Sequence, residues 1–393
     1  MNPRLEPAPA SAVAPGAGFG TESYDRLQET DWTFATARTR GETHGIHPYP
    51  AKFIPQIPRA LIAELYPKDG TAVMDPFCGS GTTLVEAAMA GIPAVGVDLH
   101  PLACLISKVK TTPLGDSVAD EAERVVRRAR DDVGAAPAIP ALDHWFTAEV
   151  QGVLAGVTRA IETVPDRDLR DALRVALSSI IVRVSNQDSD TRYAAVDKGV
   201  SAEDVRDQFT RAARGLDRAL TATWPALVSS PRVQILNRDV LLVKPEEVGR
   251  RVSLVVTSPP YPNAYEYWLY HKYRMYWLGM DPIAVRTSEI GARPNYFKRN
   301  PQTPADFERQ MGQVFGLLAG VLVPGGHVCF QVGNSVIRGE VIDNAALLKR
   351  AAAPHGFEVF AAMTRDIPTS RKAFNPSHAR IRVEDVVVFR MEK

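Results

Sequence analysis

The pattern of apolar positions after the first fifty residues predicts helix, strand, helix and strand in turn. Apolar side chains recur at helical spacing over 57–65, and a short apolar run follows at 72–74. A second helix is expected at 82–90, with Gly91 placed to end it, and a second strand at 94–97. Strand, helix and strand within roughly thirty residues form a βαβ unit. Such a unit implies a parallel sheet.

The middle of the chain keeps a helical period instead. Apolar residues recur every three to four positions over 150–161, 169–184 and 205–220. No strand pattern interrupts these runs. We therefore expect residues 115–230 to form a helical insertion between strands of the sheet.

Strand patterns resume after this insertion. The apolar runs lie at 233–236, 254–256, 327–332, 357–362 and 386–389. An amphipathic helix is expected at 307–322, and the turn 324–326 should lead into the following strand. The last two runs indicate a closing antiparallel pair. The fold class is therefore α/β, with a mostly parallel twisted sheet and a C-terminal antiparallel strand pair.

These patterns divide the chain into four parts. The first residues mix proline, alanine and glycine with little apolar content, so 1–35 is expected to be a mobile tail. The catalytic domain has a first part at 36–114 and a second part at 231–393. The helical insertion, 115–230, lies between them.

Composition excludes several classes of protein. With 393 residues and 45% hydrophobic content, the chain can bury a large core. The longest apolar run, 314–323, is too short to span a bilayer, and no apolar leader segment begins the chain, so a cytoplasmic protein with no membrane partner is expected. Cys78, Cys104 and Cys329 lie far apart, which suggests neither disulfides nor a metal site. The net charge of +1 does not decide whether nucleic acid is bound.

A glycine-rich turn connects the first strand to its helix. The segment Asp75-Pro-Phe-Cys-Gly-Ser-Gly-Thr-Thr83 lets the backbone approach a ligand closely. It lacks the G-x-G-x-x-G spacing of dinucleotide sites and the Lys-Ser/Thr ending of a P-loop, which disfavours pyrophosphate. Asp98 ends the next strand, where a carboxylate can accept both hydroxyls of a ribose.

This turn resembles the cofactor motif of the amino-methyltransferases, which methylate exocyclic nitrogens of nucleic-acid bases. The resemblance implies a Rossmann-like class I methyltransferase fold with S-adenosylmethionine as cofactor. In that family the matching residues wrap the methionine and ribose moieties, an acidic residue binds the ribose, and another contacts the adenine. The expected cofactor residues are Asp75, Phe77, Gly79, Gly81, Thr82, Asp98, Asp239 and Lys52.

A second motif follows the apolar run 254–256. Ser258-Pro259-Pro260-Tyr261 should lie at the carboxyl edge of the sheet, beside the cofactor turn. Two prolines remove two N–H donors and leave carbonyl acceptors free to meet an amino group. Hydrogen bonds to Ser258 and the Pro259 carbonyl would draw a delocalised amine towards nucleophilic geometry, so that transfer is a direct displacement driven by positioning. The ring of Tyr261 would stack on the base.

The tetrapeptide resembles that of cytosine-N4 DNA methyltransferases, whereas adenine-N6 enzymes more often begin with Asp or Asn. Carbon-5 methylation uses a Pro-Cys nucleophile, and no cysteine here follows a proline. The resemblance implies a site-specific cytosine-N4 DNA methyltransferase of the restriction-modification kind. The alternatives are an adenine-N6 DNA enzyme, a guanine-N2 RNA enzyme and a cofactor-binding DNA module without catalysis.

Two further segments bear on the site. Residues 47–53, His-Pro-Tyr-Pro-Ala-Lys-Phe, are similar to a segment that a subset of these enzymes places over the methionine end of the cofactor; the alternative is a proline-rich loop with Phe53 in the core. Near the tetrapeptide, Asn263 and Tyr265 are expected in the base pocket. The tyrosines and tryptophans of 267–277 are expected mainly in the core.

Duplex DNA with a flipped base is the expected partner; a partner restriction endonuclease cannot be inferred from the chain. Readout of sequence needs long polar side chains, and the segment 183–198 supplies Asn186 and Arg192. The basic loops 293–300 and 371–382 could meet phosphates. For each of these segments a solvated surface is the alternative interpretation.

Overall fold

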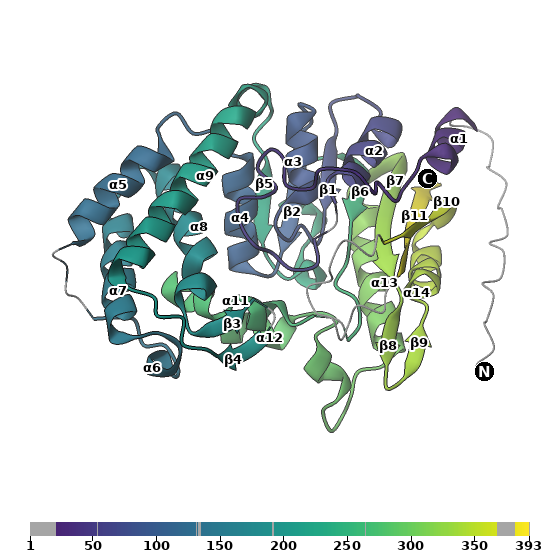
Figure 1. Ribbon diagram of the computed structural model, residues 1–393. Coiled ribbons are helices and arrows are strands. Elements are labelled where there is room, and N and C mark those ends of the chain that lie inside the picture. Colours follow the sequence, from purple (N-terminus) through teal and green to yellow (C-terminus); the bar gives the residue numbers. More distant parts are fainter. Residues whose placement is uncertain are drawn as a thin grey trace.

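A computed structural model gives the structure of the chain. It describes residues 21–52, 54–130, 132, 135–190, 192–263, 265–367 and 382–392. The expectations for residues 1–20, for Phe53 and for the loop 371–381 lie outside these residues. Figure 1 shows a central sheet covered by helices, with a separate group of helices at one end.

Seven strands form the central sheet. Their spatial order is β10 (Phe357–Asp366), β11 (Val383–Met391), β7 (Leu322–Gly333), β6 (Val252–Thr257), β1 (Ala72–Asp75), β2 (Ala94–Asp98) and β5 (Gln234–Asn237). Five neighbouring strands, from β7 to β5, pair in parallel. Strand β11 runs antiparallel to both β7 and β10. The predicted α/β class, with its parallel sheet and C-terminal antiparallel pair, is confirmed.

Helices cover both faces of the sheet. On one face lie α1 (Thr21–Glu29), α2 (Gln56–Leu65) and α3 (Thr82–Met89), and on the other lie α10 (Pro245–Val248), α13 (Pro304–Val321) and α14 (Asn344–Ala352). Successive residues of β1 alternate between the two cores, because side chains of a strand point to opposite faces. Burial on both faces explains why the strands read as continuous apolar runs.

The predicted mobile tail, 1–35, includes a segment that is folded in the structure. Residues 21–29 form a helix, and Leu27 and Trp32 are buried in the core beside the sheet. The Trp32 indole donates a hydrogen bond to the Leu27 carbonyl (2.8 Å), and Tyr24 meets the ring of Phe360 on β10 edge to face. The segment is short and polar on its outer side. It is stable because it packs on β10, which a local sequence pattern does not reveal.

The region between β2 and β5 is helical. It contains α4 (Pro101–Thr111), α5 (Val118–Ala129), α6 (Leu142–Trp145), α7 (Ala148–Glu162), α8 (Arg167–Val184) and α9 (Ala202–Ser229), with a small hairpin of β3 (Gln187–Ser189) and β4 (Arg192–Ala195). From α5 onward these helices share a core with α4 and with α11 (Tyr267–Trp277). Figure 1 shows this helical insertion gathered beyond β5 and α4.

Several short elements were not expected. They are α12 (Pro282–Ser288), a hairpin of β8 (Ser335–Ile337) and β9 (Glu340–Ile342), and three 3₁₀ turns at Val240–Leu242, Arg293–Tyr296 and Ala353–His355. The predicted turn 324–326 is a bulge inside β7, where the pairing with β6 shifts register and Gly325 has a φ of 76°. Within the described ranges, no helix is long and apolar enough to cross a membrane.

Candidate active site

A pocket with about 840 Å³ of open space lies at the carboxyl ends of four neighbouring strands. Gly79 follows β1, Asp98 ends β2, Asp239 follows β5 and Ser258 follows β6, and all four line it. The carboxyl ends of parallel strands meet at one edge of a sheet, which is where ligands bind in open α/β folds. The two motifs separated by the helical insertion therefore meet in one pocket.

Asp98 anchors the cofactor turn. One carboxylate oxygen, Oδ2, accepts the Gly79 backbone N–H (2.8 Å), and Oδ1 accepts the His100 N–H (2.8 Å). Burial raises the pKa of Asp98 to about 6, and the two backbone hydrogen bonds limit the rise. Each oxygen retains a lone pair for a further donor such as a ribose hydroxyl.

Helix α4 holds the same turn from beneath. Ser107 donates to the Gly79 carbonyl (2.8 Å), and the buried Lys110 ammonium donates to the Ser80 carbonyl (2.8 Å). A side chain at Gly81, whose φ is 81°, would begin 2.8 Å from the Ser107 hydroxyl. Only glycine fits this close approach without strain. Ser107 and Lys110 lie in no motif, so they were not predicted to support the turn.

Asp75 and Gly81 support the pocket and do not line it. Asp75 is fully buried, and its Oδ1 accepts hydrogen bonds from the Thr257 hydroxyl (2.6 Å) and the Phe77 N–H (3.1 Å). Burial raises the pKa of Asp75 to about 7. The carboxyl group thus ties the end of β1 to the end of β6 and links the two motifs. Asp75 was expected to contact the cofactor directly, but it does not line the pocket.

The tetrapeptide borders the pocket with two of its four residues. Ser258 and Pro260 line it, whereas Pro259 is buried and Tyr261 faces elsewhere. The Tyr261 hydroxyl lies 3.3 Å from Glu384 Oε1 and 3.4 Å from the Ser258 hydroxyl. These contacts fix the tyrosine at the junction of β6 and β11. The ring of Tyr261, which was expected to stack on a base, does not line the pocket.

The segment 47–52 covers the pocket. Tyr49, Ala51 and Lys52 line it, and the Lys52 ammonium donates to the His44 carbonyl (2.7 Å). Burial lowers the pKa of Lys52 to about 8.

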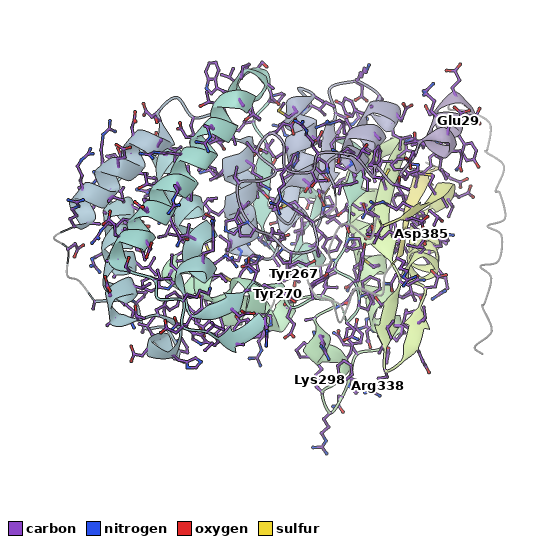
Figure 2. All side chains as sticks on the ribbon, in the orientation of Figure 1. Glu29, Tyr267, Tyr270, Lys298, Arg338 and Asp385 are labelled. Atoms are coloured by element: carbon purple, nitrogen blue, oxygen red, sulfur yellow. The ribbon has the colours of Figure 1, made fainter. Side chains whose placement is uncertain are left out.

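The ring of Tyr49 stacks on Tyr267, with centroids 6.0 Å apart. Tyr267 also lines the pocket, although its helical spacing favoured a place in the core. Figure 2 shows Tyr267 and Tyr270 where the helical insertion meets the sheet.

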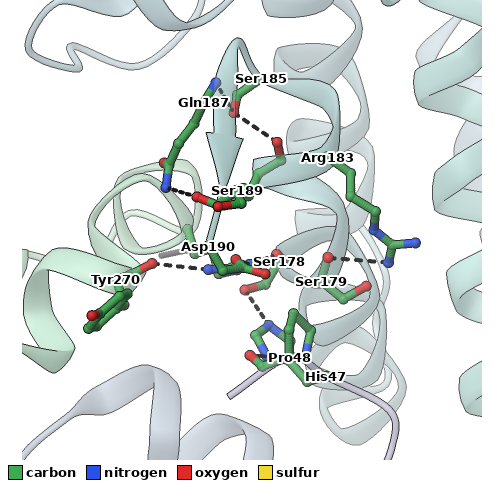
Figure 3. Close-up of polar contacts among 12 residues, drawn as sticks. His47, Pro48, Ser178, Ser179, Arg183, Ser185, Gln187, Ser189, Asp190 and Tyr270 are labelled. Atoms are coloured by element: carbon green, nitrogen blue, oxygen red, sulfur yellow. Dashed lines mark hydrogen bonds and ion pairs between the residues drawn. The ribbon is translucent and has the colours of Figure 1, made fainter. Parts of the chain in front are cut away.

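The covering segment is fastened to the helical insertion. The His47 imidazole lies 3.0 Å from the Ser178 hydroxyl on α8, and its other nitrogen lies 2.7 Å from the Pro48 carbonyl (Figure 3). Burial lowers the pKa of His47 well below its usual value, with Arg274 adding to the effect. The insertion therefore positions the cover of the pocket.

Glu289 is a second buried carboxyl in the pocket wall. It follows α12 and is 7% exposed, and its Oε1 accepts the Tyr267 backbone N–H (2.6 Å). The other oxygen, Oε2, has no hydrogen-bond partner among the described residues. Burial raises the pKa of Glu289 to about 8. Its segment carries no motif, so nothing in the sequence pointed to it.

None of the four expected substrate residues lines the pocket. The Asn263 amide donates to the Val336 carbonyl on β8 (2.6 Å). Tyr265 lies against the rings of the neighbouring tyrosines of α11. Asn186 is tied through its backbone to Trp145 on α6 and to Val196, which follows β4, and Arg192 is exposed on the β3–β4 hairpin near Asp188. Asn186 and Arg192 therefore belong to the helical insertion and lie outside the pocket lining.

Comparison with known proteins gives consistent results. Residues 18–109 match the family described as DNA methylase. The Type II methyltransferase M.MvaI of Kocuria varians is 28% identical over 253 residues, which are 59% of this chain and 56% of that protein. The Type II methyltransferase M.MjaII of Methanocaldococcus jannaschii is 42% identical over 88 residues, 22% of this chain and 15% of that protein. These matches support the resemblance to the amino-methyltransferases that the sequence motifs indicated.

The chain spans about half or less of the length of those two relatives. Among solved structures, the rRNA methyltransferase aviRa from Streptomyces viridochromogenes gives a TM-score of 0.35 at 14% identity, covering 88% of this chain and 89% of that one.

The pocket fits S-adenosylmethionine, the cofactor that the sequence resemblance implies. Phe77, Leu99 and Val240 offer apolar surface for an adenine, and Asp98 offers acceptors for a ribose. The cofactor carries positive charge on its sulfonium and ammonium groups, and the pocket wall contains buried carboxyl groups to meet that charge. Thr82 and Asp239 line the same space.

Proposed function

We propose that this chain is a DNA methyltransferase that transfers a methyl group from S-adenosylmethionine to the exocyclic N4 amine of cytosine. The observation that carries the proposal is the pocket shared by Ser258, Gly79 and Asp98. A cofactor turn and a group that can receive an amine border the same space. Serine as the first residue of the tetrapeptide supports cytosine over adenine.

When bound, S-adenosylmethionine supplies an electrophilic methyl group. The residues of the chain contribute position and hydrogen-bond acceptors. The Ser258 hydroxyl and the Pro259 carbonyl would accept hydrogen bonds from the two N–H groups of the amine and turn the nitrogen lone pair out of conjugation with the ring. Asp75, through the Thr257 hydroxyl, keeps this acceptor pair in register with the cofactor turn.

A base inside a duplex cannot enter this pocket without leaving the stack. Flipping costs roughly a few kcal/mol, which contacts with the protein must offset. The helical insertion, residues 115–230, is the proposed target-recognition region. Arg192 is exposed there and Asn186 is half-buried, and both have the long polar side chains that read base edges or phosphates.

The proposed setting is a type II modification system in the cytoplasm. The two relatives described above are named Type II methyltransferases. Cys78, Cys104 and Cys329 are buried free thiols, as expected in a reducing compartment.

Labelled S-adenosylmethionine should be incubated with the protein and either duplex DNA or tRNA, followed by nucleoside analysis. Label in N4-methylcytosine is the expected result. Label in N6-methyladenine would identify the adenine-specific alternative, and label in N2-methylguanine from tRNA would identify the RNA enzyme. Cofactor binding without any methyl transfer would support the alternative of a cofactor-binding DNA module without catalysis.

A further inference from the structure

Methylation of an amine leaves a proton to be removed. The nitrogen gains a methyl group and a positive charge, and it becomes a neutral secondary amine only when one N–H proton departs. A serine hydroxyl can accept a hydrogen bond, but at neutral pH it does not take up a second proton. If Ser258 receives the amine, the proton needs another acceptor in the pocket.

Glu289 has the features of that acceptor. Its side chain lines the pocket, is 7% exposed, and is held by the Tyr267 N–H at Oε1. Its Oε2 is buried without a partner in the described part of the chain, and the Trp268 backbone N–H acts on the carboxyl group together with that of Tyr267, so that both lower its pKa. Burying a carboxyl oxygen without a hydrogen bond is unfavourable, so such an atom in a pocket wall indicates a ligand that completes it.

The segment that carries Glu289 packs directly on the tetrapeptide. A side chain at Gly291 would begin 2.7 Å from the Tyr261 carbonyl and 3.1 Å from the Pro260 carbonyl. The Gly291 carbonyl also accepts the Asn263 N–H (2.9 Å), and its φ of 74° favours glycine. Glu289 therefore lies two residues from a backbone contact with the motif assigned to the amine.

We propose that the Glu289 carboxylate is the proton acceptor for the target amine. This inference rests on the proposed function of amine methylation. The nitrogen forms its bond to the methyl carbon as the bond from that carbon to the sulfonium sulfur breaks, and the electron pair of the broken bond stays on sulfur, which becomes neutral. One N–H bond then breaks, its electron pair stays on nitrogen, and the proton passes to Glu289 Oε2. The product is a neutral methylamine and a neutral carboxylic acid, which then loses its proton to solvent.

The charged surroundings of Glu289 make its ionisation depend on what the pocket holds. Burial is the main cause of its raised pKa, and Glu266 before α11 and Asp98 on β2 raise it further. The phenols of Tyr49 and Tyr267 also face it. A positively charged cofactor in the same pocket would favour the carboxylate, so that the acceptor forms when the donor is bound.

The decisive variant is Glu289→Gln, which keeps the size of the side chain and an oxygen for the Tyr267 N–H. Single-turnover transfer to the substrate that the wild type modifies should fall by roughly 100-fold or more. The wild-type rate should rise with pH through the ionisation of Glu289, and the variant should lose this rise. Calorimetric affinity for S-adenosylhomocysteine, the neutral-sulfur product, should stay within about threefold.

Three further variants and one spectrum sharpen the test. Glu289→Asp should recover part of the rate, and Glu340→Gln, on the exposed β8–β9 hairpin, should match the wild type. Infrared spectra of the cofactor-free protein at neutral pH should contain a carboxylic-acid band that Glu289→Gln lacks and Glu266→Gln keeps. This readout does not depend on activity.

Glu289→Gln with the wild-type rate and pH profile would overturn the proposal. A loss of product affinity in proportion to the loss of rate would also overturn it, because Glu289 would then be a cofactor-binding group. If the wild type methylates tRNA and no DNA, the proposed function fails. The same variants compared on tRNA would then still decide whether Glu289 accepts the proton.

Discussion

The two halves of the pocket are built differently. The cofactor half comes from short continuous segments at the ends of β1, β2 and β5. Its turn is held by the Gly79 N–H, which donates to Asp98, and by Ser107 and Lys110, which donate to backbone carbonyls. The substrate half brings Ser258 together with Glu289 and other residues from distant segments. In that half Glu289 Oε2 is buried without a partner among the described residues.

The difference indicates what each half does. A turn whose backbone is fixed before the ligand arrives loses little entropy on binding, which suits a cofactor that is needed in every cycle. A wall with unfilled hydrogen-bonding positions is completed only by the molecule that fills them. Variants in the two halves should therefore separate cofactor affinity from the rate of transfer.

The largest effect is expected at the tetrapeptide. Ser258→Ala should lower the single-turnover rate by about 100- to 1000-fold, an effect on the order of losing one preorganised hydrogen-bonding group in an active site. Cofactor affinity, measured by calorimetry, should not change by more than about threefold. Transfer at the wild-type rate would show that this hydroxyl does not receive the amine.

The next effect is expected at the ribose acceptor. Asp98→Ala removes the acceptor for a ribose and for the Gly79 and His100 N–H groups, so cofactor affinity should fall roughly 10- to 100-fold. At saturating cofactor the rate should recover most of its value. A variant with unchanged affinity and a lower rate would break the proposed division between the halves.

Cofactor affinity should also depend on pH. The pKa of Asp98 is about 6 in the cofactor-free pocket, and the carboxylate is the form that favours a cation. Below this value Asp98 is protonated, and the affinity should weaken by up to about tenfold per pH unit. Calorimetry from pH 5 to 8 checks this slope, using Asp98→Asn, which should lack it, as the control. Equal slopes in both proteins would assign the dependence to another group.

The smallest effects are expected for residues that support the cofactor turn and the covering segment. Ser107→Ala removes one neutral hydrogen bond to the Gly79 carbonyl, which is worth about 1 kcal/mol, so cofactor affinity should fall by roughly fivefold.

Ser178→Ala, which removes the contact of α8 with His47, should lower the stability of the covering segment by a similar amount. Hydrogen exchange at Tyr49 would measure the second effect, and no change there would mean that the insertion does not position the cover.

Local pattern was sufficient for the main elements of the sheet. The apolar runs at 72–74 and 94–97 became β1 and β2, and the helical period at 57–65 became α2. The closing pair was predicted as well, because strands buried on both faces leave continuous apolar runs in the sequence. The helix at 21–29 and the hairpin β8–β9 were not predicted, since each is short and depends on the surface it packs against.

The sequence alone predicted the strand–turn–helix unit that forms the cofactor turn, because its residues are neighbours along the chain. It located Gly79, Asp98 and Ser258 at strand ends, and parallel pairing brings such ends to one edge. Only the tertiary structure decided that Asp75 links two strands, that Asn263 is bound to β8, and that Tyr267 and Glu289 complete the wall. Those roles depend on which distant segments pack together, and the packing is set by the whole core.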